Sequence, residues 1–106
     1  MRITKVTTKT GDAGKTSLAD GQRITKNHPI INALGDLDHL NSIIGWAEVA
    51  SSNKIYSQEL KNIQQDIFNI SGDISLPDGD TALLSVDRIY YLEEKIKDMG
   101  NDLPPL

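Results

Sequence analysis

Residues 29–50, PIINALGDLDHLNSIIGWAEVA, carry the strongest structural signal in the chain. Apolar residues in it recur every three or four positions, which is the spacing of one face of an α-helix. Pro29 suits the first turn of such a helix, because a backbone N–H would have no helical partner there. The pattern predicts a helix from Pro29 to about Ala50, with an apolar stripe made of Ile30, Ala33, Leu34, Leu37, Leu40, Ile44 and Ala47.

The opposite side of this predicted helix is small and polar. By helical spacing it carries Gly35, Asp38, Ser42 and Gly45. An interior glycine costs about 1 kcal/mol relative to alanine, so the two glycines suggest close approach of another backbone or of a flat ligand. A tight helix crossing with solvated carboxylates explains the same pattern. Because Gly35 and Ser42 imply a packed surface, Asp38 is the carboxylate that most needs a cationic partner.

Two further helices follow along the chain. After a turn at residues 51–54, a second apolar stripe predicts a helix that ends near residues 72–75. Turn-forming residues fill 76–81, LPDGDT, and Ser85 can then cap a third helix, with Gly100 as its left-handed C-terminal cap. The stripes are Tyr56, Leu60, Ile63, Ile67, Ile70 and Ile74 in the second helix, and Ile89, Leu92, Ile96 and Met99 in the third.

The segment before the first helix has the composition of a phosphate-binding loop. Residues 8–26 read TKTGDAGKTSLADGQRITK and combine three glycines, four basic residues and five hydroxyl side chains. Glycines let backbone N–H groups turn toward an anion, lysines supply charge, and hydroxyls can bond phosphate oxygens or help hold Mg²⁺. No helical period is present up to His28, so we expect a long irregular arm. A flexible surface loop is the alternative.

This arm is not a Walker P-loop. That motif needs a glycine five positions before Gly14, and Lys9 stands there. The lead-in ITKVTTK is also not the buried apolar strand from which a P-loop springs.

Composition limits the possible partners. A chain of 106 residues, with a mass of 11.7 kDa, has room for one domain, here residues 1–106. Its hydrophobic share of 38% is low for a chain that buries a core alone, so some apolar surface is expected to meet a partner or a missing segment. A net charge of −4 argues against nucleic acid or an anionic membrane as the main partner.

Several kinds of site and location can also be weighed. There is no cysteine, which excludes disulfides and thiolate metal sites. His28 and His39 lack companion ligands, so metal binding by either is not expected. Trp46 and Phe68 are expected to pack in the core or at an interface. No apolar run approaches the length of a membrane span or of a signal-peptide core, which predicts a soluble, cytoplasmic protein.

The arm and the sequence ALGDLDHLNSIIGWA at 33–47 together resemble the N-terminal half of the PduO-type ATP:cob(I)alamin adenosyltransferases. Members of that family begin with TKTGD-G-T, continue through G-R-K and carry G-x-x-D-E-L-N-x-x-x-G in the first helix. The likeness is strong from Lys5 to Gly45 and weaker through residues 60–77 and 92–106.

This resemblance implies an all-α, ferritin-like up-down helical bundle behind an ATP-binding arm, assembled as a homotrimer. It implies transfer of the 5′-deoxyadenosyl group from ATP to the reduced cobalt of a corrinoid, with release of triphosphate and help from Mg²⁺. Lys9 and Asp38 match catalytic positions of the family, and Asp38 and Asn41 match its corrinoid-side motif. Its ATP-contacting positions match Thr8, Lys9, Thr10, Gly11, Thr16, Ser17 and Lys26.

The sequence departs from the family pattern in two places. His39 stands where the family has a glutamate. The FILPGG segment and the arginine-rich helix of the family, which complete the site, are not in the sequence, so we expect a truncated form with weak or no activity and with Asp38 unpaired. Two other functions stay open: an ATP-binding regulatory module without catalysis, and an inactive helical fragment.

Overall fold

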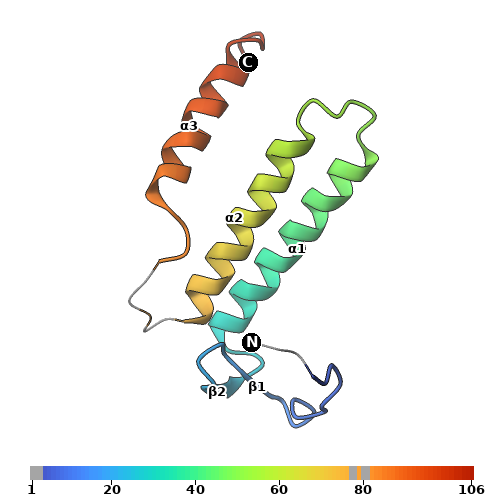
Figure 1. The fold of residues 1–106 in the computed structure, drawn as a ribbon, viewed down its shortest axis with the longest axis vertical. Helices are drawn as coiled ribbons and strands as arrows, with labels where there is room; N and C mark the ends of the chain where they lie inside the picture. The colour runs from blue at the N-terminus through green and yellow to red at the C-terminus, as the bar shows by residue number, and fades with distance from the viewer. Residues whose placement is uncertain (1–3, 77–78, 80–81) are drawn as a thin grey trace.

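The protein is an up-down arrangement of three helices with a small β-hairpin at one end (Figure 1). The computed structural model describes residues 4–76, 79 and 82–106, and the predicted turn at 76–81 therefore lies largely outside the described residues. The elements are β1 (Lys15–Ser17), β2 (Arg23–Thr25), α1 (Pro29–Ala50), α2 (Ser57–Ser75) and α3 (Val86–Gly100).

Helix α1 has the bounds that the sequence predicts. Pro29 occupies its first turn, and the Nδ1 atom of His28 accepts a hydrogen bond from the Ile30 N–H at 3.1 Å. His28 is thus the N-cap of α1, since its side chain satisfies one of the donors that the first turn leaves free. At the other end, the ammonium of Lys54 donates to the backbone oxygen of Glu48, a terminal carbonyl.

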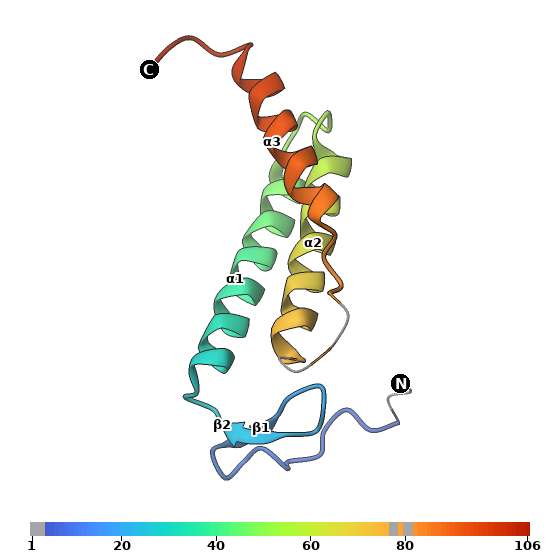
Figure 2. The ribbon, with the colours of Figure 1, turned by 90° about the vertical axis from the view of Figure 1, so that its left-hand side faces the viewer.

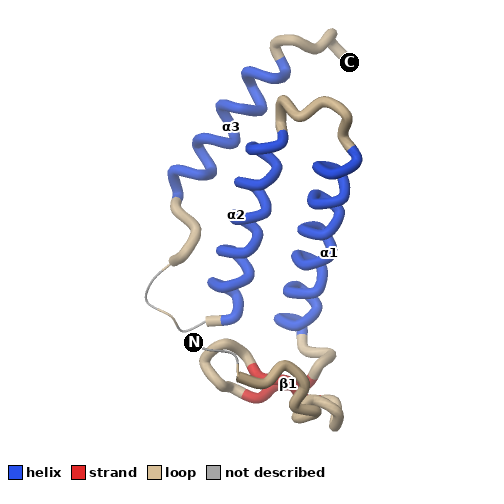
Figure 3. Tube along the Cα trace, turned by 45° about the vertical axis from the view of Figure 1, so that its right-hand side comes forward, coloured by secondary structure: helices blue, strands red, loops and turns tan. Residues whose placement is uncertain are grey.

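Helices α1 and α2 lie antiparallel and side by side in two views (Figures 1 and 3). The predicted stripe of α2 faces α1, and Ile67 at its centre is only 5% exposed. Among the described residues only Ile67 and Leu18 are buried hydrophobic residues, and no side chain is fully buried. The core is therefore a thin seam between two helices.

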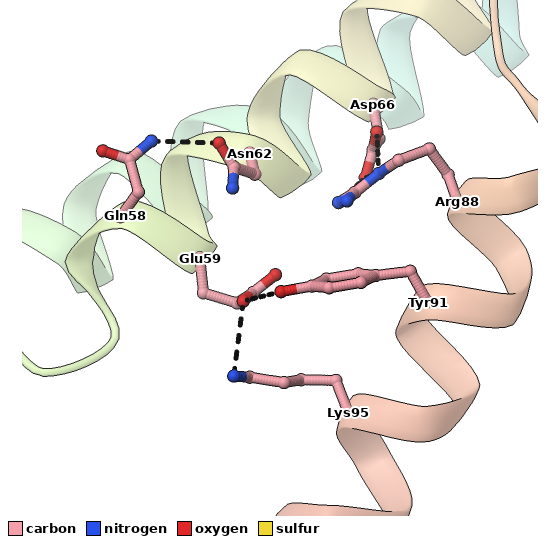
Figure 4. A network of polar contacts seen from close by, with 7 residues as sticks. All are labelled: Gln58, Glu59, Asn62, Asp66, Arg88, Tyr91 and Lys95. Carbon is pink, nitrogen blue, oxygen red and sulfur yellow. Dashed lines mark hydrogen bonds and ion pairs between the residues drawn. The ribbon is translucent and has the colours of Figure 1, made fainter.

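Helix α3 is attached to α2 through polar side chains (Figure 4). The Arg88 guanidinium grips the buried Asp66 carboxylate with two parallel contacts of 2.9 and 2.8 Å. The Tyr91 hydroxyl donates to Glu59 at 2.8 Å, and Lys95 lies 3.8 Å from the same carboxylate. Before the helix, the Asp73 carboxylate accepts from the Leu83 and Leu84 N–H groups.

The caps of α3 support one prediction and correct another. The Ser85 hydroxyl accepts from the Asp87 N–H at 3.2 Å, so Ser85 is the N-cap as predicted. Gly100, in contrast, is the last residue of the helix, and Asn101 after it keeps right-handed helical angles. The predicted left-handed cap is wrong, because the Asn101 N–H bonds back to the Lys97 carbonyl and satisfies that helix end locally.

The arm is more regular than the sequence predicts. Strands β1 and β2 pair antiparallel, with Lys15 opposite Thr25, Thr16 opposite Ile24 and Ser17 opposite Arg23. The chain reverses between them in a turn that Gly21 closes with φ of +85°, a conformation that favours glycine. The expectation of an irregular arm is thus wrong for residues 15–25. The strands are three residues long, too short to show alternation in the sequence.

In the described part of the chain, no helix combines the length and the apolar character that crossing a membrane requires.

Candidate functional site

The arm folds back on itself around Arg23. The Arg23 guanidinium donates to the Ser17 hydroxyl at 2.9 Å, to the Thr10 carbonyl at 3.0 Å and to the Lys15 carbonyl at 3.4 Å. One side chain therefore joins the turn at residues 10–13 to both strands of the hairpin. The sequence analysis missed this role, because it depends on the pairing of Arg23 with Ser17, which only the hairpin register reveals.

Lys26 lies against Gly11. A Cβ atom at Gly11 would come within 3.3 Å of both Cε and Nζ of Lys26 and of the Lys15 carbonyl oxygen. The glycine therefore makes room for the ammonium group on the surface of the turn. The backbone also closes here, because the Lys26 N–H donates to the Gly14 carbonyl at 3.0 Å.

The other predicted arm residues are only partly brought together. The Thr8 and Thr10 hydroxyls are hydrogen-bonded at 3.1 Å, beside Gly11 in the chain. Lys9 has φ of +61°, a strained value for a residue with a side chain, and its carbonyl accepts from the Asp12 N–H. Thr16 is half-buried and Ser17 is exposed, because neighbouring strand residues point to opposite faces. The predicted residues thus do not all lie on one surface.

The charge of the chain is divided between the arm and the helices. Residues 4–28 hold five basic and two acidic residues, whereas residues 29–106 hold five basic and thirteen acidic ones. None of the ion pairs found among the described residues involves the arm. Its positive charge is therefore directed at solvent or at a bound anion.

A groove of about 440 Å³ lies between α1 and α2, at the end of these two helices that is nearest the arm. Gly35 and Asp38 form one wall, and a Cβ at Gly35 would meet no atom within 4 Å. The groove therefore has open space where Gly35 lacks a side chain. Its lining is Ile31, Leu34, Gly35, Asp38, Asn41, Ile67, Phe68 and Ser71.

Asp38 and Asn41 sit differently in this groove. Asp38 is exposed, and no lysine or arginine in the described residues forms an ion pair with it. Asn41 is half-buried, and its backbone carbonyl accepts from Gln64 of α2 at 3.2 Å. Its Oδ1 atom is buried and, within the described residues, has no hydrogen-bond partner. Such an atom is costly unless a rearrangement or a ligand satisfies it.

The two glycines of α1 have different neighbours. A Cβ at Gly45 would lie 2.9 Å from the Gln64 Nε2 atom, so Gly45 permits close approach of α2. Gly35 instead opens onto the groove. Gly45 therefore fits a tight helix crossing, whereas the ligand explanation for Gly35 stays a prediction.

Trp46 and Phe68 are not core residues. They are 74% and 68% exposed, so the core alternative of the sequence prediction is wrong. Their faces of α1 and α2 find no covering element in the described residues, whereas the interface alternative stays open. Phe68 lies at the groove and is the large aromatic residue available there.

The arm lies at the end of the molecule where α1 begins and α2 ends (Figure 2), and the residues that line the groove come from those parts of the two helices. The arm joins α1 directly, and the groove is built from the first half of α1 and the second half of α2. A basic, hydroxyl-rich loop thus stands beside an open groove with apolar walls and one carboxylate. No cluster of three or more His, Asp or Glu residues in the described ranges could hold a metal ion.

The elements described here define a small helical bundle with a basic, glycine-containing arm at one end. The chain belongs to the cobalamin adenosyltransferase family, whose family model matches residues 6–106.

Individual relatives agree with this assignment. The chain is 39% identical to a cobalamin adenosyltransferase of Cupriavidus metallidurans, over 99% of this chain and 56% of the relative. It is 37% identical to the corrinoid adenosyltransferase PduO of Citrobacter freundii, over 93% of this chain and 31% of the relative. A variant PduO-type ATP:corrinoid adenosyltransferase from Lactobacillus reuteri, solved with cobalamin and ATP, superposes with a TM-score of 0.89 at 31% identity. That match covers 96% of this chain and 58% of the solved one. The chain thus spans about a third to three fifths of the length of these relatives.

Proposed function

We propose that this chain supplies the ATP-binding arm and one corrinoid-facing wall of an ATP:corrinoid adenosyltransferase. The observation that carries the proposal is that the basic arm lies at the same end of the α1–α2 pair as the groove between these two helices. Relatives solved with cobalamin and ATP support it, because their fold superposes on nearly the whole chain.

In the proposed reaction the reduced cobalt of the corrinoid attacks C5′ of ATP. A cobalt–carbon bond forms, the C5′–oxygen bond breaks, and its electron pair leaves with triphosphate. Lys26, and Lys9 from the strained turn, would stabilise the negative charge that grows on the leaving group. The Thr8, Thr10, Thr16 and Ser17 hydroxyls would donate to phosphate oxygens, and Mg²⁺ would reach the site on the triphosphate itself.

In the groove, Asp38 and Asn41 would face the corrinoid. The walls fit a large flat ligand, because they are mainly apolar and open at Gly35. The exposed Trp46, Ile43 and Val49 of α1 support contact with other chains or segments, because an apolar surface of this kind marks interaction sites. Assembly as a homotrimer, which the family resemblance implies, stays a prediction. A single domain over residues 1–106, a cytoplasmic location and completion of the site by further segments remain predictions.

The decisive experiment replaces the two arm lysines in a version extended by the C-terminal segments that the relatives have. Lys9→Ala with Lys26→Ala removes two charge-assisted phosphate contacts, each worth about 1.5–3 kcal/mol, so ATP affinity should fall about 100-fold or more. The control is Lys61→Ala with Lys97→Ala, which removes the same charge from exposed helix positions.

Adenosylcobalamin formation under reducing conditions and calorimetry with Mg-ATP are the measurements. The control should match the unsubstituted protein, while the arm variant should lose both binding and transfer. Unchanged ATP affinity and transfer in the arm variant would refute the proposal. Binding of Mg-ATP without any effect of corrinoid would instead favour a regulatory module.

A further inference from the structure

Arg23 uses its guanidinium on the arm rather than on a carboxylate. Its three contacts are the Ser17 hydroxyl and the Thr10 and Lys15 carbonyls, which belong to the turn and to β1. In the described residues it forms no ion pair. A planar fork with several donors can reach acceptors on separate segments at once, which the single ammonium of lysine cannot do with the same geometry.

The contact with Thr10 also fixes the direction of the next peptide N–H. In a trans peptide the carbonyl and the following N–H point in opposite directions. Because the Thr10 carbonyl points at Arg23, the Gly11 N–H points away from it. That N–H has no acceptor within the described part of the chain. It is a free donor on the same residue against which the Lys26 ammonium lies.

Building on the proposed function, we propose that Arg23 is the positioning residue of the arm, which presents the Gly11 N–H and the Lys26 ammonium together to the triphosphate of the nucleotide. Arg23 itself does not bind the nucleotide in this proposal. Its positive charge adds to the attraction of the arm for an anion, but its main role is to hold the turn against the β-hairpin by hydrogen bonds. Pre-organisation of this kind raises affinity, because the loop is already ordered and loses little conformational entropy when the ligand binds.

The test compares Arg23→Ala, Arg23→Lys and Lys15→Ala in the chain as it stands, with inorganic tripolyphosphate as the ligand. Lys15 is exposed on the same β-hairpin, and its ammonium forms no ion pair among the described residues, so its variant removes one arm charge. If Arg23 positions the arm, both Arg23 variants should lose about tenfold or more in tripolyphosphate affinity, because lysine keeps the charge but not the fork. Lys15→Ala should lose about threefold or less.

A second measurement needs no ligand. Amide hydrogen exchange at Leu18 and Lys26, which are hydrogen-bonded across the hairpin, should accelerate in both Arg23 variants while α1 amides stay protected. Ser17→Ala removes one of the three acceptors and should accelerate exchange at Leu18 and Lys26 less than Arg23→Ala does. This milder variant is compared by hydrogen exchange alone, because Ser17 is itself a proposed phosphate contact, and it keeps the test valid if Arg23→Ala unfolds the arm.

The outcomes separate the two proposals. Binding by the unsubstituted chain with equal affinity in Arg23→Lys would overturn the positioning role and leave the phosphate site intact. Equal losses in Arg23→Ala and Lys15→Ala would do the same. If the unsubstituted chain does not bind tripolyphosphate, the arm alone is not a phosphate site and the positioning role is overturned, whereas Mg-ATP binding by the extended version decides the proposed function separately.

Discussion

The two sides of α2 are held to their neighbours by different forces. Toward α1, α2 presents the apolar seam around Ile67 and one close approach, where Gln64 meets Gly45. Toward α3 it presents carboxylates, which form ion pairs and hydrogen bonds with Arg88, Tyr91 and Lys95 of α3 (Figure 4). The apolar stripe of α3 stays largely in solvent, since Ile89 and Ile96 are 50% and 71% exposed. Helices α1 and α2, which form the groove, are therefore held together by apolar burial, whereas α3 is held to α2 by a few hydrogen bonds and ion pairs.

The largest effect should come from cutting the main contact of α3. Arg88→Ala leaves the Asp66 carboxylate, in a residue 7% exposed, without its partner. Because an uncompensated buried charge is expensive and this pair is partly accessible, we expect a loss of about 2–4 kcal/mol in the free energy of unfolding. Hydrogen exchange should accelerate first in α3 and much less in α1, as urea titration and exchange can show.

Two further variants sharpen this prediction. Lys95→Ala removes a longer contact of 3.8 Å at a more accessible side chain and should cost only a few tenths of a kcal/mol. Combining Arg88→Ala with Asp66→Asn should cost less than Arg88→Ala alone, because the stranded charge is gone. If Arg88→Ala is no worse than Lys95→Ala, α3 is not held by polar contacts.

The sequence predicts this molecule well wherever the signal is local. The bounds of α1, the end of α2 and the Ser85 cap follow from apolar periodicity and from capping chemistry, both of which involve residues within a turn of one another. The phosphate-loop composition of the arm is likewise a local signal, but the phosphate site that it indicates stays a prediction.

The predictions fail where distant residues meet. The Asp66–Arg88 pair joins positions 22 residues apart, and the periodicity of the sequence does not predict that these two residues meet. Arg23 has the same difficulty, because its role requires knowledge of which residue it faces across the hairpin. The exposed Trp46 and Phe68 show a further limit: helical spacing places a residue on a face but does not say whether anything covers that face.

A smaller effect should distinguish the two glycines of α1. Gly35→Ala adds a methyl group in open space and gains about 1 kcal/mol of helix propensity, so unfolding should need about that much more free energy. Because the methyl group would project where the groove is open, corrinoid affinity should fall at the same time. Thermal unfolding and spectroscopic titration with cobalamin measure the two effects.

Gly45→Ala is the matched control. Its methyl group would come 2.9 Å from the Gln64 Nε2 atom, which must move and give up its bond to the Asn41 carbonyl. That loss, about 1 kcal/mol, offsets the gain in helix propensity, so little net change is expected. Should both variants stabilise equally without an effect on cobalamin, the difference between a packed and an open glycine would not hold.

The smallest effect concerns the weaker contact of α3. The hydrogen bond that Tyr91 donates to Glu59 raises the pKa of the Tyr91 hydroxyl above the ordinary value of 10.0, and desolvation and the charge of Glu59 act in the same direction. Because the folded state holds this proton more tightly, the stabilisation is complete below pH 10 and is lost as the pH rises through the raised pKa of Tyr91. Ultraviolet titration of the tyrosines, compared with that of Tyr91→Phe, should assign the most alkaline transition to Tyr91. α3 should loosen in the same pH interval, before α1 and α2 separate, since α1 and α2 are held together by apolar burial around Ile67. Simultaneous release of all three helices would show that α3 unfolds together with the α1–α2 pair, and that the two sides of α2 do not differ in stability.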